Sequence, residues 1–149
     1  MFFYERFCET VTFFAMLFDS KYELNVLINL AALDRIIEAR EARLIHMIGK
    51  ANQITMAEIE DMIKWPEPIN GFGVMTEDEK FEHLCYLIRM MKADGRIIQD
   101  EIDFCEIISE RLGYKKGVVR ELSAHIYADI AVPSDLELLR KKADKFFRG

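Results

Sequence analysis

Residues 87–112 read LIRMMKADGRIIQDEIDFCEIISERL. This pattern predicts an apolar helix, a tight turn at Asp94-Gly95 and a second helix that starts at Asp100-Glu101. Residues 27–52 read LINLAALDRIIEAREARLIHMIGKAN, and they align with the first stretch without a gap at an offset of sixty. Six positions carry the same residue in both stretches: Leu27 and Leu87, Ile28 and Ile88, Asp34 and Asp94, Ile37 and Ile97, Glu41 and Glu101, Ile48 and Ile108. The repetition predicts two copies of one helical unit.

The helix after each turn also repeats its apolar pattern. The apolar positions are Ala42, Leu44, Ile45, Met47 and Ile48 in the first copy and Ile102, Phe104, Cys105, Ile107 and Ile108 in the second. The positions between them are polar in both copies: Arg43 and Asp103, His46 and Glu106, Lys50 and Glu110. A common buried helix face is therefore expected.

The composition predicts an all-α fold. Of the 149 residues, 51% are hydrophobic, whereas only 7 are Gly and 3 are Pro. Many helix formers and few breakers in a chain of this length predict one domain, a compact orthogonal bundle of about eight helices built from two pseudo-repeats. We expect pseudo-repeat one at about residues 21–64, a linker at 65–75, pseudo-repeat two at about 76–128 and a C-terminal helix at about 135–147. A Phe-rich helix at residues 3–18 should precede them.

Four sequences of the capping-box type mark helix starts, because a Ser or Thr is followed three residues later by Glu. They begin at Ser20, Thr55, Thr76 and Ser134, and Gly113 is expected to end the helix before it. In the linker, Trp65 and Phe72 have two interpretations. They either fill the core where the halves meet, which large aromatic residues do more often, or form a partner-binding patch.

Charge and cysteine content bound the class of protein. The net charge of -6 argues against general nucleic-acid binding, which depends on basic patches. Cys8, Cys85 and Cys105 are odd in number and lack zinc-site spacing, so we expect buried reduced thiols. The apolar run near the N-terminus is shorter than a membrane span and lacks a basic start, and a cytoplasmic protein is predicted.

The turn at Asp94-Gly95 has partial EF-hand spacing, since Asp94, Gly95 and Glu101 match loop positions 5, 6 and 12. Met90 and Lys92 would occupy positions 1 and 3, where their side chains cannot supply oxygen ligands. The first copy has Leu30 and Ala32 at these positions. An ordinary calcium EF-hand is therefore rejected.

The same turn resembles the hallmark of the tellurite-resistance TerB family. That hallmark is an apolar helix, Ala-Asp-Gly, a short segment with an aliphatic residue, and a Glu that opens the next helix. KADGRIIQDE (residues 92–101) matches it, and ALDRIIEARE (residues 32–41) is similar to a degenerate copy, with Arg35 in place of Gly. The resemblance covers roughly residues 21–128. It implies a two-repeat helical domain, cytoplasmic or on the inner face of a membrane, with a paired acidic metal site and a role in stress response.

Two interpretations of the acids stay open. Asp34, Glu41, Asp94 and Glu101 could converge as four carboxylates around a divalent cation, which requires a pseudo-twofold axis through the turns. Alternatively, they only stabilise local backbone: Gly95 in a left-handed conformation, Asp94 in the turn and Glu101 in the first helical turn.

No pattern in the sequence indicates an enzyme. A phosphate-binding Gly loop, a nucleophile elbow and an HExxH motif are all missing from the sequence. His46, His83 and His125 are isolated, and the last two follow Glu79 and Glu121 by four residues, which is ordinary helix pairing. We therefore expect a non-enzymatic stress-response module whose cofactor, if it has one, is a divalent cation. The rival is a plain protein-interaction or dimerisation domain. A protein partner, a homodimer or peripheral association with a membrane complex would fit.

Overall fold

The computed structural model describes residues 19–33, 37–69, 75–93, 95, 97–126 and 135–148. In these residues the chain forms seven α-helices and no β-strand. The helices are α2 (Ser20–Ala31), α3 (Ala39–Ala51), α4 (Met56–Lys64), α5 (Glu77–Met91), α6 (Gln99–Arg111), α7 (Val118–Ser123) and α8 (Leu136–Asp144). The all-α prediction is confirmed for this part of the chain. The helix expected at residues 3–18 lies outside it, as does Ser134.

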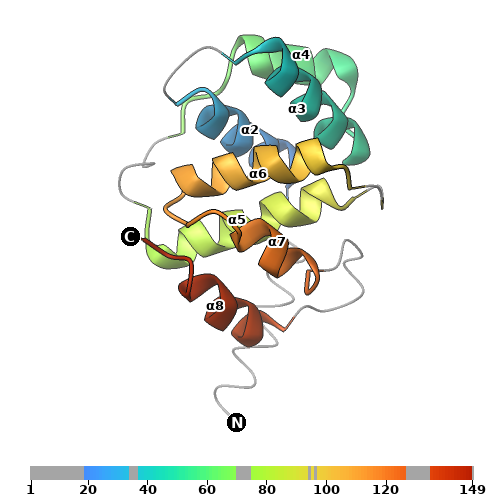
Figure 1. Cartoon of the computed structure of the whole chain (residues 1–149). Helices are drawn as coiled ribbons and strands as arrows, with labels where there is room; N and C mark the ends of the chain where they lie inside the picture. Colours follow the sequence, from blue (N-terminus) through green and yellow to red (C-terminus); the bar gives the residue numbers. More distant parts are fainter. Residues whose placement is uncertain are drawn as a thin grey trace.

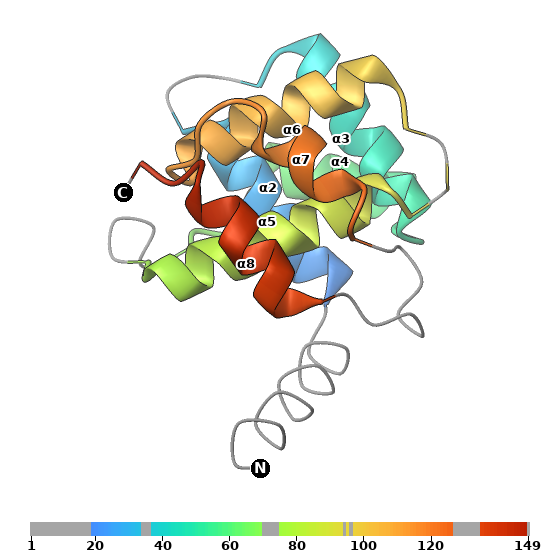
Figure 2. The same cartoon turned by 60° about the horizontal axis from the view of Figure 1, so that its bottom comes forward.

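Four helices, α2, α3, α5 and α6, form the centre of the molecule, and each contacts the other three. α4 packs on α2 and α3, whereas α7 packs on α5 and α6. α8 packs on α7, and its Arg140 lies over the Phe81 ring of α5. Figure 1 places α4 at the top and α8 at the bottom, and Figure 2 brings α8 in front of α5. None of the described helices is long and apolar enough to cross a membrane.

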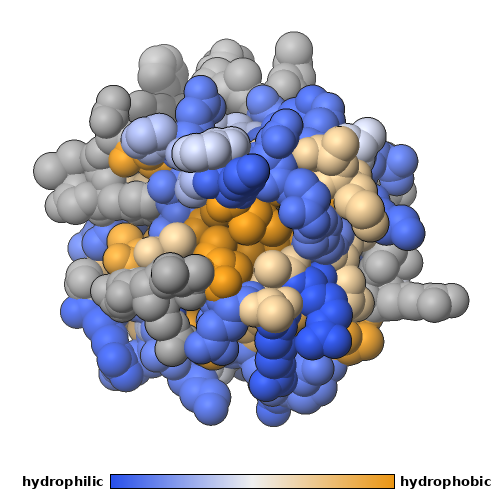
Figure 3. Space-filling view, turned by 90° about the horizontal axis from the view of Figure 1, so that it is seen from above, coloured by the Kyte–Doolittle hydropathy of each residue, from blue (hydrophilic) through white to orange (hydrophobic). Residues whose placement is uncertain are grey.

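The hydrophobic core lies where the four central helices meet. Its fully buried side chains include Leu24, Ile28, Ile45, Ile48, Leu84, Ile88, Cys105 and Ile108. Burial of each large aliphatic side chain contributes about 1.5–3 kcal/mol. Apolar side chains also reach the surface at the centre of the face seen from above, the α3 and α4 end, with hydrophilic residues around them (Figure 3).

The prediction of a common buried face is wrong for Met47 and Ile107. Met47 is 39% exposed and Ile107 is 45% exposed. Each follows a fully buried residue, Ile45 or Cys105, by two positions, and a helix turns about 200° over two residues. Both side chains therefore lie on the outer side of their helices.

Two of the four predicted caps, Thr55 and Thr76, are confirmed, whereas α2 and α8 are capped by a neighbour of the predicted serine. Thr55 forms the reciprocal capping box with Glu58, and the Thr76 hydroxyl accepts the Glu79 N–H at 3.1 Å. At α2 the cap is Asp19 instead of Ser20, because the Asp19 carboxylate accepts the N–H groups of the next two residues at 3.0 and 3.3 Å. The side chain of Asp135 caps α8 by accepting the Leu138 N–H.

Several features of the first half of the chain, residues 20–64, recur sixty positions later in the second half, residues 76–148. α2 ends at Ala31 and α5 at Met91, while α3 and α6 begin and end sixty residues apart. Gln53 follows α3 with a φ of 65°, and Gly113 follows α6 with a φ of 103°, as predicted for that glycine. The next amides, of Ile54 and Tyr114, each donate to a carbonyl five residues back at 3.0 Å. Both helices therefore end in a Schellman motif.

The C-terminal ends of the central helices are capped across the halves. The side-chain amide of Asn52, after α3, donates to the Met90 carbonyl at the end of α5 at 3.0 Å. Arg111, the last residue of α6, donates to the carbonyls of Leu30 and Ala31 at the end of α2. The last carbonyls of a helix have no partner within it, so each half satisfies a helix end of the other.

Candidate functional site

The four predicted site residues lie, in the sequence, close to the starts of α3 and α6. Glu41 and Glu101 lie in the first turns of these helices, whereas Asp34 and Asp94 are outside the described residues. The Oε2 atom of each glutamate is buried, and Glu101 as a whole is 4% exposed.

An ion pair joins the two helix starts. Arg40 Nη2 and Asp100 Oδ1 lie 3.1 Å apart, and these residues directly precede Glu41 and Glu101 in the sequence. The starts of α3 and α6 are therefore neighbours, each with one of the predicted glutamates. In the part of the chain that the structure describes, no three His, Cys, Asp or Glu side chains are grouped so that they could hold a metal ion.

One residue of the turn before α6, Gly95, has the backbone conformation expected for it. Gly95 has a φ of 74°, the left-handed conformation predicted for it. Ile98 is the N-cap, and its side chain cannot accept a hydrogen bond. Asp100 and Glu101 therefore supply the negative charge that favours the start of the helix.

A buried pair of titratable groups joins α2 to α5. His83 Nδ1 and Glu23 Oε2 lie 2.9 Å apart, with 12% and 7% of the side chains exposed. The interpretation of His83 as isolated, or as a partner of Glu79, is thus wrong, because its ring faces the neighbouring helix. The available signal was its position, sixty residues after Glu23.

Burial and charge act on both members of this pair. Burial raises the pKa of Glu23, and the hydrogen bond with His83 lowers it by less, so it lies above the ordinary value. For His83, burial lowers the pKa, but the hydrogen bond and charge of Glu23, with the charges of Glu82 and Glu79, raise it above its ordinary value. Both groups therefore hold their protons more tightly in the folded chain.

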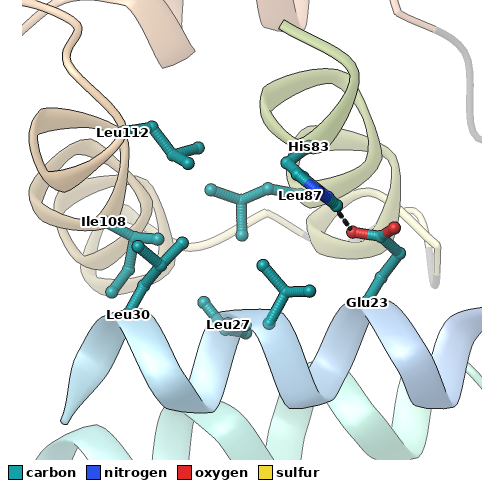
Figure 4. Close-up of a pocket in the computed structure, with 8 residues that line it drawn as sticks. Glu23, Leu27, Leu30, His83, Leu87, Ile108 and Leu112 are labelled. Carbon is teal, nitrogen blue, oxygen red and sulfur yellow. Dashed lines mark hydrogen bonds and ion pairs between the residues drawn. The ribbon is translucent and has the colours of Figure 1, made fainter. Parts of the chain in front are cut away.

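Beside this pair is a narrow apolar cleft between α2, α5 and α6. Figure 4 shows Glu23 and His83 facing each other at one side, with Leu27, Leu87 and Ile108 nearby. The cleft offers about 10 Å³ to the centre of a water molecule, which is room for about one water. Small-molecule sites usually measure about 300–1,000 Å³. The cleft is too small for a ligand of that size.

A wider cleft lies between α2, α4 and the segment after α4. It encloses about 1120 Å³, open solvent included, and Tyr22 and Trp65 contribute to its lining. Trp65 is 74% exposed, so the prediction that it fills the core is wrong, whereas Phe72 lies outside the described residues. Asn25 explains the placement of the segment: its amide donates to the Glu67 carbonyl at 3.0 Å and accepts the Glu67 N–H at 3.1 Å. This pairing holds the extended backbone against α2, and Trp65 projects from it.

Glu106 is a buried carboxylate that the sequence pattern did not indicate. It is 4% exposed and accepts the N–H groups of Gly117 at 2.7 Å and Arg120 at 3.0 Å. It therefore caps α7 from α6. The matching residue of the first half, His46, also reaches the next helix, with Nε2 at 3.0 Å from Glu60 of α4.

Two cysteines agree with their prediction as buried free thiols, Cys85 and Cys105, whereas Cys8 lies outside the described residues. Burial raises the pKa of the Cys85 thiol to about 12 and also raises that of Cys105. A thiol needs ionisation to act as a nucleophile, so neither is reactive at neutral pH.

Comparison of the chain with models of protein families, with curated proteins and with solved structures finds no match.

Proposed function

We propose that the chain is a non-enzymatic helical module of the TerB type that acts in stress response and binds a divalent cation through the turns before α3 and α6. One observation carries this proposal. Arg40 and Asp100 join the two helix starts at 3.1 Å, and the glutamates that follow them each keep one carboxylate oxygen from solvent. With Asp34 and Asp94, Glu41 and Glu101 would provide four carboxylates.

The chemistry of these groups favours a hard cation. Carboxylate oxygens are the usual ligands of Ca²⁺ and Mg²⁺, and several acids at one site raise the affinity. The net charge of -6 also favours a cationic ligand. In this proposal the protein is cytoplasmic and acts through a protein partner. A protein complex at a membrane surface would be such a partner.

The site requires two pseudo-repeats related by a twofold axis, and contacts between matched residues support that arrangement. Glu23 contacts His83, and Arg40 contacts Asp100, and in both cases the partner is sixty positions away. Two equivalent residues of a twofold arrangement contact each other only near the axis. An axis beside the Arg40–Asp100 pair would bring the turns before α3 and α6 together. The bounds of α3 and α6, which lie sixty residues apart, and the paired Schellman motifs support the same repeat.

Thermal melts of metal-free protein, with Ca²⁺, Mg²⁺, Mn²⁺ and Zn²⁺ added in turn, test the proposal. A ligand that binds only the folded state at a hundred times its Kd adds about 2.7 kcal/mol of stability. We expect one cation to raise the melting temperature, and the double variant Glu41→Gln/Glu101→Gln to lose the rise. Glu137→Gln, at an exposed position in the first turn of α8, is the matched control and should keep it.

No rise with any of the four cations would rule out the cation site. A rise that persists in the double variant would move the binding elsewhere on the chain.

The exposed aromatic residues favour a second candidate, a protein-interaction domain whose acids only stabilise turns. Trp65 at 74% and Tyr22 at 49% exposure lie beside the wider cleft. This candidate predicts no response to cations, together with a partner whose binding is lost in Trp65→Ala.

A further inference from the structure

The outer side of α3 carries a row of positive charge. Four exposed residues recur at spacings of three and four, which aligns them on one face of the helix. They are Arg40, Arg43, Met47 and Lys50, here called the cationic stripe. Met47, with 39% exposure, adds an apolar side chain between the charges.

The outer side of α6 carries the opposite row. At the same spacing stand Asp100, Asp103, Ile107 and Glu110, here called the acidic stripe, and all four are exposed. Each member lies sixty positions after a member of the cationic stripe. A cation is replaced by an acid at three positions, and Met47 corresponds to Ile107. The two stripes therefore match in length, spacing and position of the apolar residue, with opposite charge.

The stripes belong to helices that pack against each other in one chain. Arg40 and Asp100 join their N-terminal ends at 3.1 Å, both with more than half of the side chain exposed. The remaining charges of both stripes are exposed to solvent. The two rows therefore meet at the Arg40–Asp100 pair, and the surface that they form carries charges of both signs.

We propose that this surface binds a second copy of the chain, with the cationic stripe of each copy against the acidic stripe of the other. In a twofold dimer the same patch serves both subunits, so the patch must be complementary to itself. Two stripes of equal spacing and opposite sign meet that condition, and the apolar Met47 and Ile107 complete it. A purely basic or purely acidic partner would match one stripe and be repelled by the other. The dimer does not depend on bound cation.

Two charge-reversed variants test the dimer. The α3-reversed variant carries Arg43→Glu/Lys50→Glu, and the α6-reversed variant carries Asp103→Lys/Glu110→Lys. In either one alone, both stripes have the same sign, and like charges across an interface are strongly unfavourable. We expect the Kd for self-association, measured by sedimentation, to rise at least about a hundredfold in each. In an equimolar mixture, both contacts of the mixed dimer pair opposite charges, so a heterodimer should form.

The control is Lys116→Glu/Lys141→Glu, which changes the net charge as much as the α3-reversed variant does but at exposed positions outside the stripes. It should dimerise like the unchanged chain. Circular dichroism checks that every variant is folded. Raising the salt from about 50 to about 500 mM should weaken the unchanged dimer, because exposed charges are screened. A monomeric unchanged chain, a dimer insensitive to salt, or a mixture of folded variants that stays monomeric would each overturn the proposal.

Discussion

Replacing Glu106 by Ala should destabilise the protein severely, because this carboxylate accepts two backbone N–H groups at the start of α7. The side chain is nearly inaccessible to water, so neither N–H group gains a solvent partner when it is removed. A hydrogen bond to a charged group contributes about 1.5–3 kcal/mol, and two of them predict a loss of about 3–6 kcal/mol. Glu106→Gln keeps one acceptor oxygen and turns its amide group toward a donor, so a loss of about 1.5–3 kcal/mol is expected.

Urea unfolding followed by circular dichroism measures these losses directly. In a chain of this length, about 1 kcal/mol shifts the melting temperature by roughly 2–4 °C, so Glu106→Ala should melt about 10 °C lower. Glu110→Ala, at an exposed site on the same helix, is the control. Measured in dilute protein, where the second copy is not bound, it should change the free energy of unfolding by less than about 0.5 kcal/mol. A Glu106→Ala variant within about 1 kcal/mol of the unchanged chain would refute the assignment of Glu106 as the cap of α7.

Two further predictions follow from buried or strained residues. The folded-state pKa of His83 lies above its ordinary value of 6.5. His83 therefore stabilises the fold fully below pH 6.5, and this effect is lost as the pH rises through the raised pKa. The pKa of Glu23 is also raised, so Glu23 acts in the same direction above pH 4.5. Urea unfolding from pH 6 to pH 9 should therefore show falling stability, and a slope unchanged in His83→Gln would contradict this. Gln53 occupies the left-handed position that Gly113 occupies in the other half, so Gln53→Gly should stabilise by about 0.5–1 kcal/mol and Gly113→Gln should destabilise by about 1–2 kcal/mol in thermal melts. If both variants melted at the temperature of the unchanged chain, neither position would carry backbone strain.

The positions of α3, α4 and α6 could be predicted because they depend on local patterns. Apolar periodicity fixes which residues face the core, and a threonine such as Thr55 satisfies the first amides of its own helix. Those signals lie within a few residues of the structure they determine. Met47 departs from the pattern because it follows the buried Ile45 by two residues and so lies on the outer side of α3.

The residues that were missed depend on contacts between distant parts of the chain. Trp65 is exposed because Asn25, forty residues earlier, fixes the backbone from which it projects. His83 is paired because α2 packs on α5, and no nearby residue indicates that contact. Of the candidate site, the sequence predicted acidic residues before two helices. The proximity of those helix starts became apparent only through the Arg40–Asp100 ion pair.

Because each half caps a helix of the other, we expect that neither half folds alone. Residues 20–64 contain α2 but lack the guanidinium of Arg111 that closes its last turn, and residues 76–148 contain α5 but lack the amide of Asn52. Each fragment alone would lose these caps and expose the apolar surface that the other fragment covers. A chain cut between the halves should therefore stay folded only while the two pieces remain associated, and its stability should depend on fragment concentration. Reciprocal capping gives a single chain the cooperativity of an obligate dimer.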